Sequence, residues 1–241
     1  MRAETRHQLK QDRFSKVTMD AAEATVNWSA EHQSSLIIGG IVVAVIVAAG
    51  FGGWYYLNQQ NDAASAALSQ AVRTLDTPIR PAGAPPQADQ QTFASIQERD
   101  TAATKQLQAI VDKYRYTHTA ETARYLLGTT AAEMGDNAAA ERDLKEVTSA
   151  HNNDLAALAR FALASVYRST GRSKQAIDLY NRLIAKPTDS VGKAEAQIEL
   201  ANTYQEENQS TEARRIYQQI QKENPSSDVA QLASQKLEAM K

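Results

Sequence analysis

"YRSTGRSKQAIDLYNRLIAKP", residues 167–187, returns 37 positions downstream as "YQEENQSTEARRIYQQIQKENP", residues 204–225. In this alignment Tyr180 falls on Tyr217, Ala176 on Ala213 and Leu183 on Ile220. A shift of 36 positions upstream brings out a third, looser copy. A fixed period of a few tens of residues indicates a small structural module that must stack on its neighbours to bury its apolar face. The sequence therefore predicts a repeat protein.

Apolar residues inside each copy recur at spacings of three and four, which is the helical period. In the second copy they are Leu163, Val166 and Tyr167, followed by Ile177, Tyr180, Leu183 and Ile184. Between the two apolar runs stands Gly135 in the first copy and Gly171 in the second, and glycine adopts the positive φ that ends a helix at little cost. Pro187 and Pro225 end the second run, because proline cannot continue a helix. Each copy is predicted to be two amphipathic helices.

These residues resemble the tetratricopeptide pattern, which combines a Leu-Gly pair, a tyrosine, an alanine, a large residue and a closing proline in about 34 residues. The third copy matches through Leu200, Ala201, Tyr204, Ala213, Tyr217 and Pro225. The second matches through Leu163, Ala164, Tyr167, Gly171, Ala176 and Tyr180, and the first through Leu127, Gly128, Gly135, Ala140 and Leu144. The usual early tryptophan is replaced by Arg124, Arg160 and Gln197. The resemblance implies an all-α, tetratricopeptide-like α-solenoid over residues 119–241, with repeats at about 121–154, 157–190 and 194–225 and a capping helix at 227–240.

"LIIGGIVVAVIVAAGFGGWYYL", residues 36–57, contains no charged residue. About 20 apolar residues in a helix are long enough to cross the hydrocarbon core of a bilayer. Trp54, Tyr55 and Tyr56 stand where an interfacial aromatic belt belongs. A cleaved signal peptide is one alternative, but its apolar region is normally only about 7–15 residues long. A buried core helix is another, but no globular domain precedes the segment to cover it. We predict a single transmembrane helix.

Basic residues indicate the orientation of this segment. The N-terminal side carries Arg2, Arg6, Lys10, Arg13 and Lys16, whereas the first basic residue after the segment is Arg73. Because cytoplasmic flanks are enriched in Lys and Arg, we expect a cytoplasmic lead segment, residues 1–35, and repeats in the periplasm, in a single-pass protein of the bacterial inner membrane. The lead segment is either an amphipathic helix on the membrane surface, through Phe14, Val17, Ala21, Ala24 and Trp28, or a plain soluble linker helix.

Residues 58–118 are predicted to form a helical hairpin, which is a degenerate fourth repeat. An alanine-rich run, "NDAASAALSQAVRTL", precedes a loop at residues 76–91 that holds four of the chain's six prolines. The run "FASIQERDTAATKQLQAIVDKYRY" after the loop again has helical spacing. Only Gly52 and Gly53 stand between the apolar segment and the alanine-rich run, so the first helix of the hairpin continues the membrane helix or starts anew.

Composition excludes several kinds of function. The net charge is −2, with 26 basic and 28 acidic residues, which is unlike a nucleic-acid-binding protein. The chain has no cysteine, and its four histidines, His7, His32, His118 and His151, are too dispersed to suggest a metal site. A phosphate-binding loop and catalytic motifs are absent from the sequence. We therefore predict a protein that is not an enzyme and that needs no cofactor or metal.

The tetratricopeptide resemblance implies that the first helix of each repeat lines a concave groove. The residues carried over to this groove are Thr122, Tyr125, Thr129 and Glu133 in the first repeat, Leu158, Phe161, Ser165 and Arg168 in the second, and Glu195, Ile198, Asn202 and Gln205 in the third. Tyr125, Phe161 and Ile198 occupy one position in successive repeats. They form either an apolar stripe that binds hydrophobic peptide segments or part of the core beneath a neighbouring helix.

A second candidate surface lies in the apolar segment. Gly40, Ala44, Ala48 and Gly52 recur at every fourth residue, so they share one helix face, and small residues at this spacing allow close helix packing in membranes. The face is a candidate for homo-oligomer formation or for docking on a translocon helix, although small residues are common in membrane helices generally.

The layout of the whole chain resembles the ancillary Sec-translocon subunit family, whose members are bacterial inner-membrane proteins with an exported tetratricopeptide-like domain. The resemblance covers the cytoplasmic lead, the single span, the helix that begins "NDAASAAL" and the degenerate repeats. It implies a protein-binding scaffold beside the Sec translocon, exported chaperones or their clients. The stretch "YTHTAETARYLLG", residues 116–128, is also similar to repeats of envelope proteins that coordinate cell-wall and outer-membrane biogenesis. That function stays open as the alternative, and an enzyme is the third hypothesis.

Overall fold

The computed structural model describes residues 32–81, 83, 92–223 and 225–240. The helices of this part are α2 (Gln33–Leu75), α3 (Ile96–Lys113), α4 (His118–Glu133), α5 (Asn137–Val147), α6 (Asn153–Ser169), α7 (Ser173–Ala185), α8 (Lys193–Glu206), α9 (Ser210–Glu223) and α10 (Asp228–Ala239). The chain forms two compact units, residues 1–58 and 59–241. This helical architecture confirms the prediction of an all-α fold. The predicted amphipathic helix between Phe14 and Trp28 lies outside the described residues.

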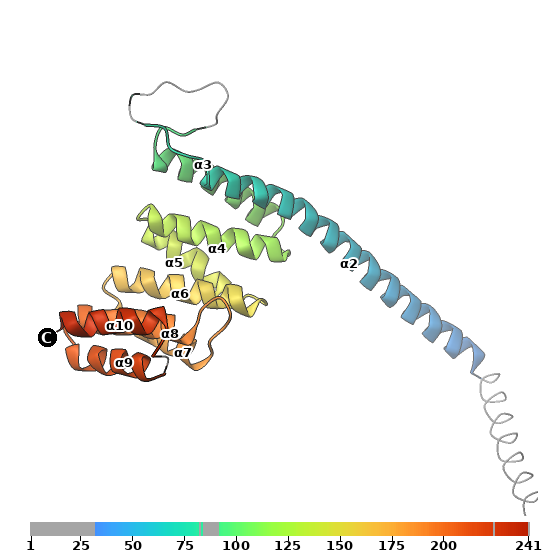
Figure 1. The fold of residues 1–241 in the computed structure, drawn as a ribbon. Coiled ribbons are helices and arrows are strands. Elements are labelled where there is room, and N and C mark those ends of the chain that lie inside the picture. Colours follow the sequence, from blue (N-terminus) through green and yellow to red (C-terminus); the bar gives the residue numbers. More distant parts are fainter. Residues whose placement is uncertain (1–31, 82, 84–91, 224, 241) are drawn as a thin grey trace, which may run out of the picture. The chain divides into compact units, whose positions relative to one another are not determined.

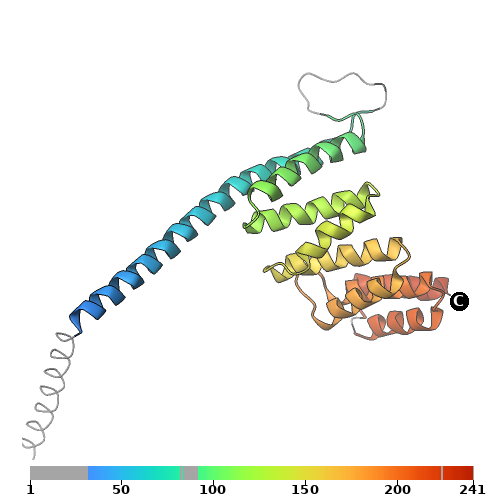
Figure 2. The same cartoon turned by 180° about the vertical axis from the view of Figure 1, so that it is seen from behind.

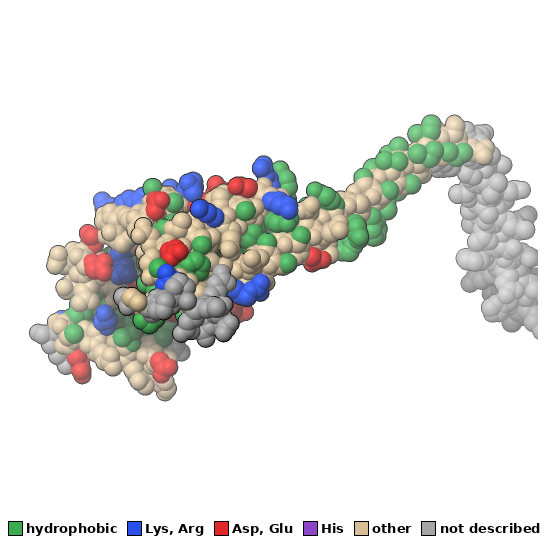
Figure 3. Space-filling view, turned by 90° about the horizontal axis from the view of Figure 1, so that it is seen from above, with side chains coloured by type: hydrophobic (Ala, Val, Ile, Leu, Met, Phe, Trp, Pro, Cys, Tyr) green, Lys and Arg blue, Asp and Glu red, His purple; other side chains and the backbone are tan. Residues whose placement is uncertain are grey.

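The described part of the first unit is the N-terminal portion of α2. Its large apolar side chains face outward, with exposed fractions from 45% at Leu57 to 69% at Phe51. Figure 3 shows hydrophobic side chains on the outside of this helix. Within the described residues, α2 is the one helix long and apolar enough to cross a membrane. The helix continues without a break through Gly52 and Gly53.

The second unit stacks helical pairs in sequence order (Figures 1 and 2). The C-terminal part of α2 packs on α3 through a cluster that includes Ala64, Ala71, Leu107 and Ile110. From α3 to α10 each helix contacts the next one, and the first helices of adjacent pairs also meet, α4 with α6 and α8 with α10. The unit is therefore an α-solenoid that ends in a single helix, α10.

Several helices of the solenoid begin at a residue whose side chain caps the first turn. The side chains of Thr117, Asp136 and Asn152 accept hydrogen bonds from backbone N–H groups in the first turns of α4, α5 and α6, which satisfies donors that have no partner inside the helix. The turns within the repeats contain Gly135 at φ 80° and Gly171 at φ 73°. The third repeat has no glycine at this point, and Asn208 takes φ 60° instead, because asparagine tolerates the left-handed region better than most residues.

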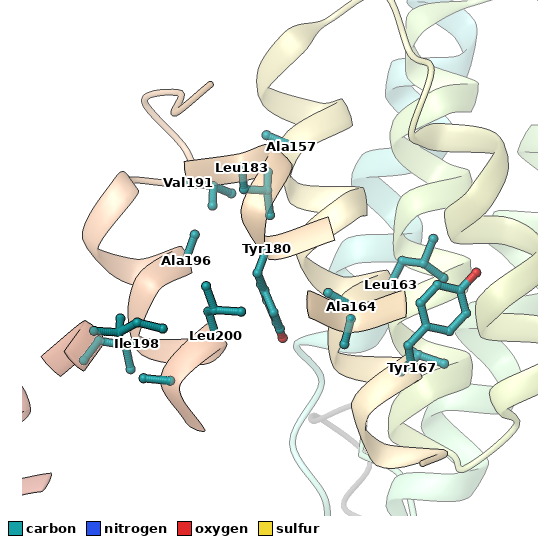
Figure 4. Close-up of a cluster of buried hydrophobic side chains, with 14 of the residues drawn as sticks. Ala157, Leu163, Ala164, Tyr167, Tyr180, Leu183, Val191, Ala196, Ile198 and Leu200 are labelled. Atoms are coloured by element: carbon teal, nitrogen blue, oxygen red, sulfur yellow. The ribbon is translucent and has the colours of Figure 1, made fainter. Parts of the chain in front are cut away.

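The main core runs through the last three repeats. It combines alanines, which let the helices approach closely, with leucine, isoleucine and valine side chains and two fully buried tyrosines, Tyr180 and Tyr217. Figure 4 shows Tyr180 between Ala164 of α6 and Leu200 of α8. A second close approach lies at Gly128, where an added Cβ would stand 2.6 Å from Leu144 Cγ. The glycine of the tetratricopeptide pattern is therefore required here for space, not for its backbone freedom.

The loop between α2 and α3 is closed at its base by main-chain hydrogen bonds. The N–H of Arg80 donates to the carbonyl of Phe93 at 3.0 Å, and the N–H of Phe93 donates to the carbonyl of Pro78 at 3.3 Å. The chain on either side of the proline-rich segment is therefore held together at Arg80 and Phe93, and α2 and α3 still form a hairpin.

Candidate protein-binding groove

A cavity of about 390 Å³ lies along the first helices of the later repeats. Its lining residues are Arg168 of α6, Asn202, Gln205 and Glu206 of α8, and Lys236 of α10. Three of them, Arg168, Asn202 and Gln205, belong to the predicted groove. The structure therefore brings part of the predicted set together at one open site whose lining is entirely polar or charged.

Charge in the groove is balanced. The guanidinium of Arg168 makes ion pairs with Glu206 at 2.7 Å and with Glu199 at 3.3 Å, so it links α6 to α8. Lys236, by contrast, makes no ion pair with any described residue. Two carboxylates thus accompany two cations, and the site does not select strongly for a ligand of one charge.

Amide side chains supply the neutral hydrogen-bonding groups. The hydroxyl of the buried Tyr217 donates to Asn202 Oδ1 at 2.8 Å and lies 3.4 Å from Gln205 Oε1. The hydroxyl has a single proton, so the shorter contact holds the Asn202 amide by its oxygen and orients it. Burial, followed by the charge of Glu199, raises the pKa of Tyr217, so its hydroxyl stays protonated and able to donate. The amide nitrogen of Gln205 remains available as a donor to a ligand carbonyl.

The predicted apolar stripe is not an exposed surface. Ile198 is only 6% exposed and belongs to the main core. At this position the structure supports the core alternative and not an exposed groove residue. Phe161 is half-buried and meets the ring of Tyr180 edge-on, with centroids 5.8 Å apart. Tyr125 is half-buried against a small cluster that includes Val147, and burial raises its pKa.

The other predicted groove residues are spread along α4 and α6. Glu133 and Ser165 are exposed, Thr129 is half-buried, and Leu158 packs on the main core. The structure does not bring these four to the polar cavity. Conversely, the sequence prediction missed Glu206 and Lys236. Lys236 was missed because the sequence prediction treated the last helix only as a cap. Since α10 follows the third repeat, it occupies the place that the first helix of a fourth repeat would take.

The other predicted surface, on α2, is open in the structure. Gly40, Ala44, Ala48 and Gly52 are all exposed, and an added Cβ at either glycine would meet no atom within 4 Å. Among the described residues, no three His, Cys, Asp or Glu side chains gather as metal ligands would. The cavity thus lies on an α-solenoid and is lined by charged and hydrogen-bonding side chains.

Comparison with known proteins agrees with this class. The chain belongs to the family described as tetratricopeptide repeat-like domain, which matches residues 26–241. A tetratricopeptide repeat protein from Parabacteroides merdae matches at 19% identity with a TM-score of 0.54, over 74% of this chain and 60% of that one. Nearly identical TPR-like repeats from Podosopora anserina match at 15% identity and TM-score 0.54, over 72% of this chain and 82% of that one. The chain thus spans less than two thirds of the first of these structures. The comparison with curated proteins found no match.

Proposed function

We propose that the chain is a membrane-anchored, non-catalytic scaffold that holds a protein-binding tetratricopeptide groove on the exported side of the bacterial inner membrane. The observation that carries the proposal is the polar cavity lined by Arg168, Asn202, Gln205, Glu206 and Lys236, on a solenoid whose chain also contains an apolar helix. Protein binding is the usual use of such concave surfaces.

The chemistry of the cavity favours the main chain of an extended segment. An extended peptide presents carbonyl oxygens to Gln205 and Lys236 and N–H groups to the carboxylate of Glu206. Main-chain recognition tolerates many side-chain sequences. The buried position of Ile198 removes the apolar stripe as the main source of affinity. The ligand class is therefore a polar or mixed extended segment rather than a strongly hydrophobic one.

The layout of the chain supports a role in protein translocation. The lead segment, single apolar helix and exported repeats resemble the ancillary Sec-translocon subunit family, so the expected partners are the translocon, exported chaperones or their clients. Residues 116–128 are similar to repeats of envelope-assembly proteins, and coordination of cell-wall or outer-membrane biogenesis is the alternative. The small-residue face of α2 is a candidate contact with another membrane helix, either of the translocon or of a second copy.

Photo-crosslinking in intact membranes tests the proposal. A photoreactive amino acid replaces Gln205 in the groove or, as a matched control, the exposed Gln175 on α7, and the crosslinked proteins are identified by mass spectrometry. Translocon or chaperone adducts at Gln205 but not at Gln175 support the leading function, and envelope-assembly proteins support the alternative. Identical adduct patterns at the two positions would rule out the groove as the binding surface.

A further inference from the structure

The turn between α3 and α4 carries an unusually exposed aromatic residue. Tyr116 is 80% exposed, the highest value among the exposed large hydrophobic side chains of the described chain. Lys113 and Arg115 beside it are also exposed, and the Lys113 ammonium lies 5.1 Å from the centre of the Tyr114 ring. The apolar ring of an exposed tyrosine is not stabilised by contact with water. An exposed tyrosine beside two cations is therefore typical of a surface that binds another molecule.

Hydrogen bonds fix this turn to the start of the second unit. Thr119, three residues after Tyr116, donates to Asn61 Oδ1 from its hydroxyl at 2.9 Å and from its N–H at 3.3 Å. The hydroxyls of Thr119 and Ser65 lie 3.0 Å apart. Thr119 is only 8% exposed, so these bonds are shielded from water. The turn therefore stays next to Asn61.

Asn61 itself lies close to the end of the apolar segment. It is four residues beyond Leu57, a distance of about 6 Å along a helix and at most about 14 Å for any conformation of the chain. The polar headgroup layer on each side of a bilayer is about 5–8 Å thick. If residues 36–57 cross the membrane, chain length alone keeps Asn61, and with it the turn, at or near the headgroups.

We propose that the turn at residues 113–118 is a second membrane contact, in which the Tyr116 ring enters the headgroup region and Lys113 and Arg115 face lipid phosphates. The proposal rests on the membrane anchor of the proposed function. Tyrosine favours this interface because its ring is apolar and its hydroxyl polar. Asp112 offsets one of the two cations, which leaves this short stretch with a net positive charge.

Site-directed spin labelling on the full chain tests this contact. Because the chain has no cysteine, single variants Tyr116→Cys, Met134→Cys and Val43→Cys each take one nitroxide label. Met134 is a matched control, since it is 42% exposed and follows the other end of α4, about 24 Å away. Each labelled chain is reconstituted in phosphatidylcholine vesicles with or without phosphatidylglycerol. Collisions with lipid-soluble oxygen and with a water-soluble nickel chelate are then compared.

The expected result is a higher ratio of oxygen to nickel collisions at position 116 than at position 134. The anionic lipid should favour the bound turn roughly fivefold for its net positive charge. Equal ratios at 116 and 134, with position 43 inside the lipid, would overturn the contact and leave the proposed anchor standing. A water-exposed position 43 would overturn the anchor, and the proposed contact with it.

Discussion

The two units of this chain place the same kinds of residue in opposite surroundings. Apolar side chains of α2 from Ile37 to Leu57 are 45–69% exposed, whereas the core residues of the solenoid are at most 9% exposed. Both sets of side chains lie on α-helices. For both, removal of their apolar surface from water is favourable. The solenoid meets this need by stacking repeats, but the first unit has no protein layer over its apolar helix in the described chain. The exposed apolar surface of α2 therefore needs a partner from outside the described chain, whereas the apolar surface of the solenoid does not.

The largest expected contrast is between two truncations of large apolar residues. Leu144 is fully buried, so Leu144→Ala should lower the free energy of unfolding of the solenoid by about 2–5 kcal/mol through lost burial and a cavity. Ile41 is 58% exposed, so Ile41→Ala should leave that free energy unchanged. Urea unfolding of the purified full chain in detergent measures both. Equal losses would contradict the separate roles of the two regions.

A smaller contrast is expected between two glycine substitutions. Gly128→Ala places a Cβ 2.6 Å from Leu144 Cγ, and overpacking of this kind costs about 1–3 kcal/mol, which exceeds the gain of up to about 1 kcal/mol in helix propensity. Gly50→Ala meets no atom within 4 Å and should leave solenoid stability unchanged. Thermal unfolding of the two variants compares them. A stabilised Gly128→Ala protein would show that α4 and α5 are packed less closely than described.

Within the solenoid, two equivalent tyrosines should respond differently to loss of the hydroxyl. Tyr217 donates to Asn202, so Tyr217→Phe should cost about 0.5–1.5 kcal/mol. The hydroxyl of Tyr180 has no hydrogen-bond partner among the described residues, so Tyr180→Phe should be neutral or slightly stabilising. Urea midpoints of the two variants measure the difference, and a larger loss for Tyr180→Phe than for Tyr217→Phe would refute it.

The smallest effect is expected at an exposed ion-pair network between repeats. Hydrogen bonds from Lys145 and then from Arg172 lower the pKa of Glu141 from 4.5 to about 2. The charged form therefore stabilises the fold above pH 4.5, and this contribution is lost as the pH falls from about 4.5 toward 2. Because its partners Lys145 and Arg172 are 54% and 35% exposed, solvent screens both ion pairs, and Glu141→Gln should cost only about 0.5–1 kcal/mol at pH 7. The gap between wild type and variant should close on acidification; a constant gap would exclude this charge effect.

Sequence periodicity was sufficient to predict the helical pairs, because a spacing of three and four marks the apolar face of each helix. It did not locate the turn at Asn208, because the third repeat has no glycine there. Periodicity could not predict which apolar side chains remain exposed to solvent. Phe161 and Ile198 occupy the same position of the repeat, yet Phe161 is half-buried and Ile198 is in the core. The participation of Lys236 in the groove could not be predicted either, since it depends on how the terminal helix packs.

The central claim is that the apolar helix crosses the membrane and leaves the solenoid on the exported side. Protease added to spheroplasts that carry the protein with an N-terminal tag tests this claim most directly. The account predicts that the residues beyond Asp62 are digested while the tag stays protected. Protection of the repeats would contradict the orientation and every exported partner proposed, and digestion at both ends would contradict the membrane span itself.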